Sequence, residues 1–211
     1  RMYKSAVDKG SVPFMSRSFS VIPVRTVEPP VTNPAMATMI TGELPVVHGV
    51  YSRKDRELRV PTLFSKRSRE DTAFLEGDTR ILKTELPPRL HVAAKGKGCD
   101  HWIYQAACRA AKEGKSFIFA HFHEIDDAAH AFGPYSSACM EKLEEADRYI
   151  EGLSKIFSGE ILLISDHGMH ETRDGGNHGE SVLPCAVKDK HERSSCLYAM
   201  EDMLAIWGER I

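Results

Sequence analysis

The sequence predicts an α/β fold with a mostly parallel sheet that is covered by helices on both faces. Short apolar runs without a helical period, at 116–122 and 161–164, are typical of strands buried on both faces. Amphipathic segments with helical spacing, clearest at 101–112 and 135–157, alternate with such runs. The chain has 211 residues, which suits one sizeable core, so we expect a single domain over residues 1–211.

The N-terminal part contains one short helix and one extended segment. Residues 1–10 have the pattern of a helix end, with Gly10 as the stop signal. Residues 20–27 are rich in β-branched side chains and are expected to be extended. Because proline cannot donate a backbone hydrogen bond, Pro23 predicts an edge strand or an irregular one.

Thr32 is the first candidate for a chemical role. The sequence Thr32-Asn33-Pro34 is a turn signal, and the small residues at 35–40 predict a helix directly after it. Backbone N–H groups and the dipole at a helix N-terminus favour an anion. Threonine is also a common helix cap, so the position by itself is compatible with either role.

The middle of the chain is expected to be largely irregular. Residues 51–89 are charged, and Ser65–Asp71 is the expected exposed loop. Residues 90–94 predict a short strand that ends at Lys95-Gly96-Lys97. Lysines are mostly solvated, yet the carboxyl end of a strand is also where ligands bind in such sheets, which leaves an anion-binding role open for both.

The C-terminal part is predicted to hold a strand at 182–187 and an amphipathic helix at 200–207. Upstream of them, Asp147 interrupts the apolar stripe of the helix expected at 135–157. We interpret Asp147 as a surface or capping residue and not as a catalytic one.

Composition narrows the class of protein. Hydrophobic residues make up 42% and charged residues 27%, which is typical of a soluble globular protein, and the net charge of −2 argues against a surface for nucleic-acid polymers. Five cysteines without paired spacing indicate a reducing compartment such as the cytoplasm, with Cys108 and Cys139 buried. No apolar run approaches the roughly 20 residues that span a bilayer. The chain begins at Arg1, so a targeting segment could precede it.

Five polar residues follow the two clearest strands. Asp126 and His130 come after the first strand, four residues apart, and would share one side of a helical turn. Asp166 and His167 end the second strand, and His178 follows a Gly pair. Ligands of open α/β sheets bind beyond the carboxyl ends of strands, so these side chains are expected to meet.

The mixture of carboxylates and imidazoles indicates a metal site. Zinc is the first expectation, with manganese or iron as alternatives in a site richer in oxygen. Each residue alone has an ordinary structural explanation: Asp-His-Gly, for example, could be a capping turn. The other histidines are interpreted as structural or as supports of the ligands, and they include His48, His121, His123 and His170.

Four motifs in order resemble the type I phosphodiesterase and nucleotide pyrophosphatase family of the alkaline phosphatase superfamily: TNPAMATMITGELPVVHGV, EIDDAAHAFGP, ISDHGM and GGNHG. The resemblance runs from about Thr32 to Gly179. It implies an alkaline phosphatase-like three-layer α/β/α sandwich and hydrolysis of phosphodiester or nucleotide pyrophosphate bonds in a small phosphorylated substrate.

The resemblance also implies roles for individual residues. Three would hold one zinc ion: Asp126, His130 and His178. Two would help to hold a second ion: Asp166 and His167. Thr32 would be the nucleophile, would lie against the metals and would carry a covalent phosphoryl group. Metal coordination suits this role, because a threonine hydroxyl is a weak nucleophile at neutral pH.

Some positions depart from the family pattern. The family places a further metal-binding Asp at the end of its first strand, which this sequence lacks, and Asp8 is a poor substitute. We therefore expect the domain to lack its first strand and the second metal site to be incomplete. Ala35 occupies the position of an Asn that contacts phosphoryl oxygens, and Asn33 is the candidate replacement. The motif Asp-x-x-Gly-His reads Asp-x-x-Ala-His here.

A second likeness points to a different substrate. Phosphonoacetate hydrolases of the same superfamily carry Thr-Asn-Pro at the nucleophile and Ala-Lys-x-Lys after a strand, as at Thr32 and at Lys95 and Lys97 here. Arg53 stands where those enzymes place an Asn, so it is a further substrate-binding candidate. A phosphonoacetate hydrolase-like activity is thus the alternative enzyme function. The absent Asp also motivates a non-catalytic protein that binds a phosphorylated ligand.

Overall fold

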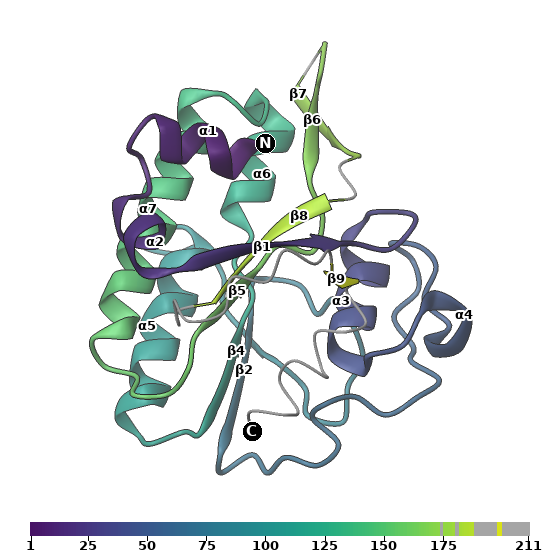
Figure 1. Cartoon of the computed structure of the whole chain (residues 1–211). Helices are drawn as coiled ribbons and strands as arrows, with labels where there is room; N and C mark the ends of the chain where they lie inside the picture. Colours follow the sequence, from purple (N-terminus) through teal and green to yellow (C-terminus); the bar gives the residue numbers. More distant parts are fainter. Residues whose placement is uncertain (174, 180–181, 188–197, 200–211) are drawn as a thin grey trace.

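The computed structural model describes residues 1–173, 175–179, 182–187 and 198–199. Helices and strands alternate along most of the chain, and helices lie on both sides of the central strands (Figure 1). The predicted α/β class is confirmed. The helix expected at 200–207 lies outside the described residues.

A parallel three-stranded sheet forms one half of the centre. Strand β2 (Thr72–Glu76) lies between β3 (Arg89–Leu90) and β4 (Phe117–Ala120), and both pairings are parallel. The irregular structure expected for residues 51–89 is therefore wrong at β2. Only five residues form this strand and a charged loop precedes it, so its own sequence is a weak signal. Pairing on both sides and burial of Phe74 and Leu75 stabilise it instead.

The second sheet has the order β5–β8–β1–β9. Its strands are β5 (Leu162–Ile164), β8 (Val182–Val187), β1 (Ser20–Arg25) and β9 (Tyr198–Ala199). Among the described strands of the two larger sheets, β8 alone runs antiparallel to its neighbours.

The edge position expected from Pro23 is wrong, because β1 pairs on both sides. Pro23 lies opposite Pro184 of β8, and β9 pairs with β1 only from Val24 onward. Neither proline has a backbone N–H, so this pair of residues forms no N–H hydrogen bond between the strands. The register therefore allows β1 to contain a proline although it pairs on both sides.

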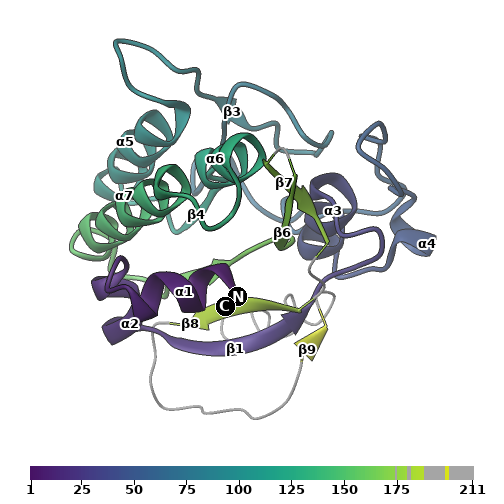
Figure 2. The same cartoon turned by 90° about the horizontal axis from the view of Figure 1, so that it is seen from above.

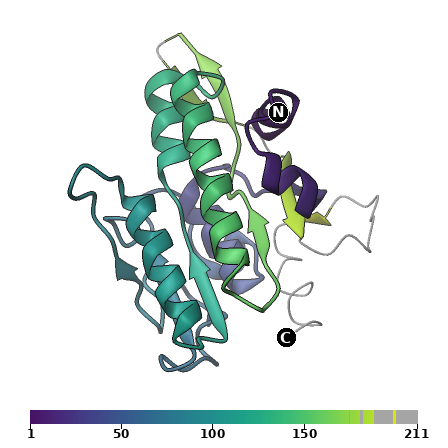
Figure 3. The ribbon, with the colours of Figure 1, turned by 90° about the vertical axis from the view of Figure 1, so that its left-hand side faces the viewer.

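Helices cover both faces of the strands. One side carries α5 (Cys99–Lys112), α6 (Glu124–Phe132) and α7 (Ser137–Ser154), and Figure 3 faces this layer. The opposite side carries α3 (Thr32–Thr41) and α4 (Pro45–His48). The short helices α1 (Met2–Asp8) and α2 (Pro13–Ser18) pack with α7 in one apolar cluster. The helices predicted near 1–10, 35–40, 101–112 and 135–157 are thereby confirmed.

Several smaller predictions have mixed outcomes. Cys108 and Cys139 are buried as expected. The strand expected at 90–94 is only β3, since residues 91–94 lead into an exposed turn. The strand at 182–187 is confirmed as β8. None of the described helices has the length and apolar character needed to cross a membrane.

An unpredicted hairpin stands beside α6. It consists of β6 (Met169–Thr172) and β7 (Gly175–His178), and β7 packs along α6 (Figure 2). A Cβ atom at Gly176 would lie 2.5 Å from the carbonyl oxygen of Ala129. Only glycine therefore permits this close approach, which brings the end of β7 to α6.

An apolar cavity of about 340 Å³ lies between β4 and β5. These strands are the edges of the two larger sheets, as far as the described residues show. Ile118–Phe122 line one side and Leu162–Ile164 another. The cavity reaches polar groups that include Asp126, Asp166 and His167.

Asp147 is buried and fixes α2 against α7. Its carboxylate accepts hydrogen bonds from the backbone N–H groups of Phe14 (3.0 Å) and Met15 (2.7 Å), in the first turn of α2. The expected capping role is confirmed, although the helix that it caps is a different one. We expect Asp147→Ala to lower the free energy of unfolding by about 2–3 kcal/mol, because it leaves two buried donors unpaired. Urea unfolding measures this, and Arg148→Ala on the exposed side of α7 should change little.

His48 is a buried neutral imidazole. Its Nδ1 accepts a hydrogen bond from the N–H of Val50, and its Nε2 contacts Thr38 Oγ1 at 3.0 Å. Burial lowers the pKa of His48 from 6.5 to about 4. Between these values the unfolded chain binds more protons than the folded one, so stability falls as the pH decreases.

We expect this group to remove about 2 kcal/mol of stability between pH 8 and pH 5. Urea unfolding at both pH values measures the loss. His48→Gln should reduce the difference in the free energy of unfolding between pH 8 and pH 5 by about 2 kcal/mol. The exposed control His170→Gln should leave this difference unchanged. An unaltered pH dependence in His48→Gln would contradict the assignment.

Candidate metal-binding active site

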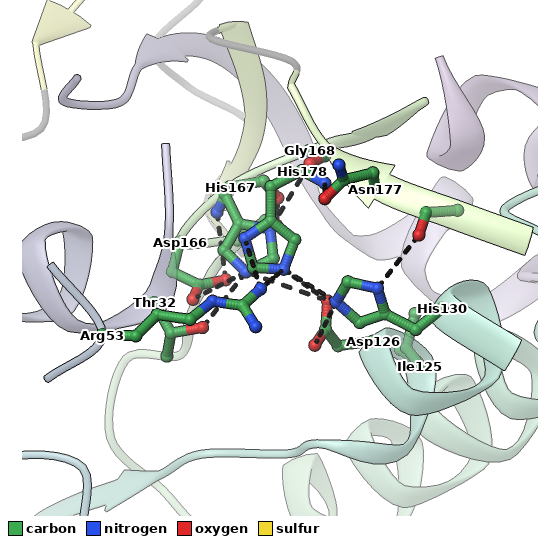
Figure 4. A network of polar contacts seen from close by, with 12 residues as sticks. Thr32, Arg53, Ile125, Asp126, His130, Asp166, His167, Gly168, Asn177 and His178 are labelled. Carbon is green, nitrogen blue, oxygen red and sulfur yellow. Dashed lines mark hydrogen bonds and ion pairs between the residues drawn. The ribbon is translucent and has the colours of Figure 1, made fainter. Parts of the chain in front are cut away.

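The five predicted metal ligands meet at one place, as Figure 4 shows. Asp126 and His130 lie one turn apart on α6, and His178 is the last residue of β7. Asp166 and His167 follow β5 directly. Two residues from the opposite helical layer, Thr32 of α3 and Arg53 from the segment after α4, complete the group. 

The first cluster contains one carboxylate and two imidazoles. His130 Nε2 lies 2.8 Å from His178 Nε2 and 3.5 Å from Asp126 Oδ2, and His178 Nε2 lies 3.7 Å from Asp126 Oδ1. On the other edge of its ring, His130 Nδ1 contacts the carbonyl oxygen of Gly176 at 3.0 Å. A carbonyl can only accept, so Nδ1 carries the proton and Nε2 directs a lone pair at the cluster.

His178 is held in its neutral form. Its side chain is 4% exposed. Burial, followed by the charges of His167 and Arg53, lowers the pKa of His178 to about 3. An imidazole that stays unprotonated at neutral pH is the form that binds a metal ion.

The cluster fits a divalent metal ion. Its donor atoms lie within 4.8 Å of one another. Asp126 Oδ1 is buried and, among the described residues, has no hydrogen-bond partner. A buried carboxylate oxygen without a partner is costly, and a cation between the three side chains would satisfy it. Two histidines and a carboxylate also form the ligand set of many catalytic zinc sites.

Asp166 and His167 lie against the first cluster. The rings of His167 and His178 stack with centroids 3.7 Å apart, and His167 Nε2 lies 3.4 Å from Asp166 Oδ2 and 3.8 Å from Asp126 Oδ1. Thr26 Oγ1 donates to the carbonyl of Asp166 at 2.6 Å, which fixes the turn after β5. This turn lets adjacent residues face one centre, which a continuing strand could not do.

Thr32 contacts the imidazole of His167. Its Oγ1 lies 3.2 Å from His167 Nε2. The helix cap is Val31, and Thr32 makes no side-chain capping bond, so the capping interpretation is not supported. Its hydroxyl is instead directed at the site, at the N-terminus of a ten-residue helix.

Arg53 brings a positive charge to the same place. Its Nη2 lies 2.7 Å from His178 Nε2 and 3.1 Å from His178 Nδ1. The guanidinium thus occupies the open side of the ligand cluster, where it can contact an anion.

Three other candidates have different surroundings. Asn33 is buried, and its side-chain nitrogen lies 2.9–3.3 Å from the backbone carbonyls of Arg53, Asp55 and Ile81. This amide holds the neighbouring loop, so its predicted contact with a phosphoryl oxygen is not supported. Lys95 and Lys97 lie on an exposed turn, and nothing in the described residues joins them to the ligand cluster.

A second group of possible ligands went unpredicted. Glu76 of β2 is fully buried and contacts His121 and His123, which follow β4. Its partners were interpreted only as structural or supporting residues. No local pattern predicts the strand that carries Glu76, so no sequence pattern indicates that the three residues meet.

Comparisons with known proteins show the family of this chain. Residues 8–107 and 89–207 match the family model of the type I phosphodiesterase / nucleotide pyrophosphatase proteins. The chain belongs to this family. A comparison with curated protein sequences gives no match. Membership in the phosphodiesterase family confirms the resemblance inferred from the motifs, within the alkaline phosphatase superfamily.

Solved structures share the fold of this phosphodiesterase family member. Phosphonoacetate hydrolase from Sinorhizobium meliloti 1021, in complex with phosphonoformate, has a TM-score of 0.60 and 19% identity over 79% of this chain and 53% of the other. Murine ectonucleotide pyrophosphatase / phosphodiesterase 5 has a TM-score of 0.57 and 17% identity, over 76% and 52%. The chain therefore spans about half the length of these proteins.

Proposed function

We propose that this chain carries the catalytic core of a metal-dependent hydrolase of phosphodiester or nucleotide pyrophosphate bonds in small substrates. The observation that carries the proposal is the meeting of Asp126, His130 and His178 with the hydroxyl of Thr32, which lies 3.2 Å from His167 Nε2. Ligands for a cation and an aligned nucleophile are the two requirements for phosphoryl transfer.

Asp126, His130 and His178 would hold one ion, and Asp166 and His167 would contribute to a second. Zinc suits these ligands best, and manganese or iron are alternatives. Bound divalent ions would supply positive charge that lowers the pKa of the threonine hydroxyl and neutralises charge on phosphoryl oxygens. Thr32 is close enough to His167 to share such a centre.

In the proposed reaction, Thr32 Oγ1 forms a bond to phosphorus while the bond from phosphorus to the leaving oxygen breaks. The hydroxyl proton of Thr32 passes to water. The leaving oxygen departs on the opposite side of phosphorus with the electron pair of the broken bond and takes up a proton from water. Water then attacks the phospho-threonine and restores the hydroxyl. The N-terminal N–H groups of α3 and the guanidinium of Arg53 are positioned to stabilise the charged phosphoryl oxygens.

The second centre needs more ligands than Asp166 and His167. The family resemblance implies a carboxylate at the end of a first strand. The apolar cavity between β4 and β5 offers room for such a strand, because both edges that face it lack strand partners among the described residues. A strand parallel to β4 and β5 in that place would end beside Asp126 and Asp166.

Hydrolysis of bis-p-nitrophenyl phosphate by protein loaded with zinc or manganese tests the proposal. Turnover that disappears with a chelator and returns with metal is the expected result. In a protein with an intact N-terminus, two tightly held ions that are both lost when Asp126, Asp166 and His178 are replaced would agree with the two-metal site. One such ion or none, without turnover of a phosphoester, would instead indicate a binding protein for a phosphorylated ligand.

Phosphonoacetate hydrolysis is the second candidate function. The specific observation in its favour is the phosphonate ligand in two of the similar structures, one with phosphonoformate and one with phosphonoacetate. Thr32-Asn33-Pro34 and the two lysines of the 94–97 turn add to it. Release of phosphate from phosphonoacetate, without turnover of the phosphodiester, would decide for this function.

A further inference from the structure

A second cluster of metal-ligand type lies at the carboxyl ends of β2 and β4. Because Leu75 pairs with Ala120 in the parallel register, Glu76 and His121 follow at neighbouring positions. His123 begins α6 as its cap residue. The donor atoms of Glu76, His121 and His123 lie within 4.8 Å of one another.

The distances match a coordination sphere. Glu76 Oε2 lies 2.9 Å from His121 Nδ1 and 3.2 Å from His123 Nε2. Ligands of a tetrahedral zinc ion, with bonds of about 2.0–2.1 Å, are separated by about 3.3 Å. Little rearrangement would therefore place an ion between these three side chains.

Glu76 provides an independent sign of a missing cation. Its side chain is fully buried, and Oε1 has no hydrogen-bond partner among the described residues. A carboxylate that is removed from water is stabilised only when both of its oxygens have partners. Both histidines contact Oε2, so Oε1 remains without a partner among the described residues. A bound ion that contacts both oxygens would satisfy both.

His123 presents one ring nitrogen to the cluster. Its Nε2 lies 3.2 Å from Glu76 Oε2 and 3.2 Å from the backbone nitrogen of Gly77. In the neutral tautomer that is protonated at Nδ1, the single lone pair of Nε2 can bind an ion shared with Glu76 in place of its contact with Gly77. A Cβ at Gly77 would lie 2.8 Å from the ring of His123, so only glycine fits beside this imidazole.

We propose that Glu76, His121 and His123 form a separate site for a zinc-type divalent cation, with an open fourth position. The backbone supports this ligand set, because Asp100 accepts from the N–H groups of His123 and Glu124 and so holds the start of α6. His121 also lines the cavity beside the principal site, and both imidazoles are 20% exposed. Water or a small anion can therefore reach the fourth position.

The competing explanation is an ion pair without metal. Burial alone would lower the pKa of His121, but the charge of Glu76 and its hydrogen bond raise that pKa to about 9. An imidazolium at His121 would then neutralise Glu76 with no cation. This explanation leaves the buried Glu76 Oε1 without a partner among the described residues.

Cobalt(II) binding in a background that lacks the principal site separates the two explanations. The background protein is Asp126→Asn with Asp166→Asn and His178→Ala, which removes ligands of both ions proposed for the principal site. After dialysis it should retain one cobalt ion per chain, with the visible absorption of a tetrahedral site. His123→Gln or His121→Gln in this background should each remove that ion, and His101→Gln should not. The readout does not depend on hydrolysis, so it is separate from the proposed function.

A background protein that retains no cobalt overturns the proposal, and so does an ion that survives both histidine changes. Glu76→Gln, which preserves side-chain shape, is the third variant and should also lose the ion. Circular dichroism and the melting temperature establish that each variant is folded. If one of these three variants fails to fold, the other two still test whether the ion is bound by this cluster.

Discussion

Thr32→Ala should reduce kcat/KM for bis-p-nitrophenyl phosphate by on the order of 10³-fold or more. The change removes the hydroxyl that contacts the imidazole of His167, and with it the atom proposed to attack phosphorus. Steady-state hydrolysis by metal-loaded protein measures the loss.

Thr41→Ala is the matched control, because this threonine ends the same helix and donates only to the carbonyl of Ala37. It should keep activity within about twofold. Trapping of a phosphorylated protein in the parent, and not in Thr32→Ala, would support the covalent step directly. Full activity in Thr32→Ala would eliminate the nucleophile assignment.

His178→Ala should weaken binding of the first ion by at least about 100-fold and abolish the corresponding activity. Removal of this ligand leaves only Asp126 and His130 in the first cluster. Mutation of a residue that merely supports a metal ligand already lowers metal affinity by about 10–100-fold, so loss of a ligand itself should lower it at least as much. Competition with a chromogenic chelator measures the affinity.

The control for this change is His170→Ala in the same hairpin. His170 is exposed and belongs to β6, so its loss should leave metal affinity unaltered. Equal affinities in the two variants would show that the first ion, if bound, is held elsewhere.

The fold could be predicted where local patterns are strong. The helix at α7 has a long apolar stripe, and the strands at β4, β5 and β8 are continuous apolar runs. Strand β2 escaped prediction because its stability comes from two neighbours and not from its five residues. The predicted edge position of β1 is wrong for a similar reason. Pro23 is tolerated inside the sheet because the strand register places it opposite Pro184, and that register depends on a distant strand.

The residues of the site could be predicted more completely than the strand and loop contacts that surround them. Asp126 and His130 are four residues apart and Asp166 and His167 are adjacent, and each pair follows an apolar run, so the sequence pattern already indicates that each pair acts together. The meeting of Glu76 with His121 depends on the pairing of two strands, 45 residues apart. The structural use of Asn33 depends on three loop carbonyls, which no sequence pattern locates.

The hairpin that carries His178 gives the first ion a mechanical role. Asp126 and His130 belong to helix α6, which packs on α7, whereas His178 belongs to a two-stranded ribbon held by its packing on α6. An ion shared between them would tie the ribbon to the core, and its binding free energy would add to the local stability of residues 169–178. Release of the ion and opening of the ribbon would then be one event, and amide protons in the ribbon would exchange more slowly as metal concentration rises.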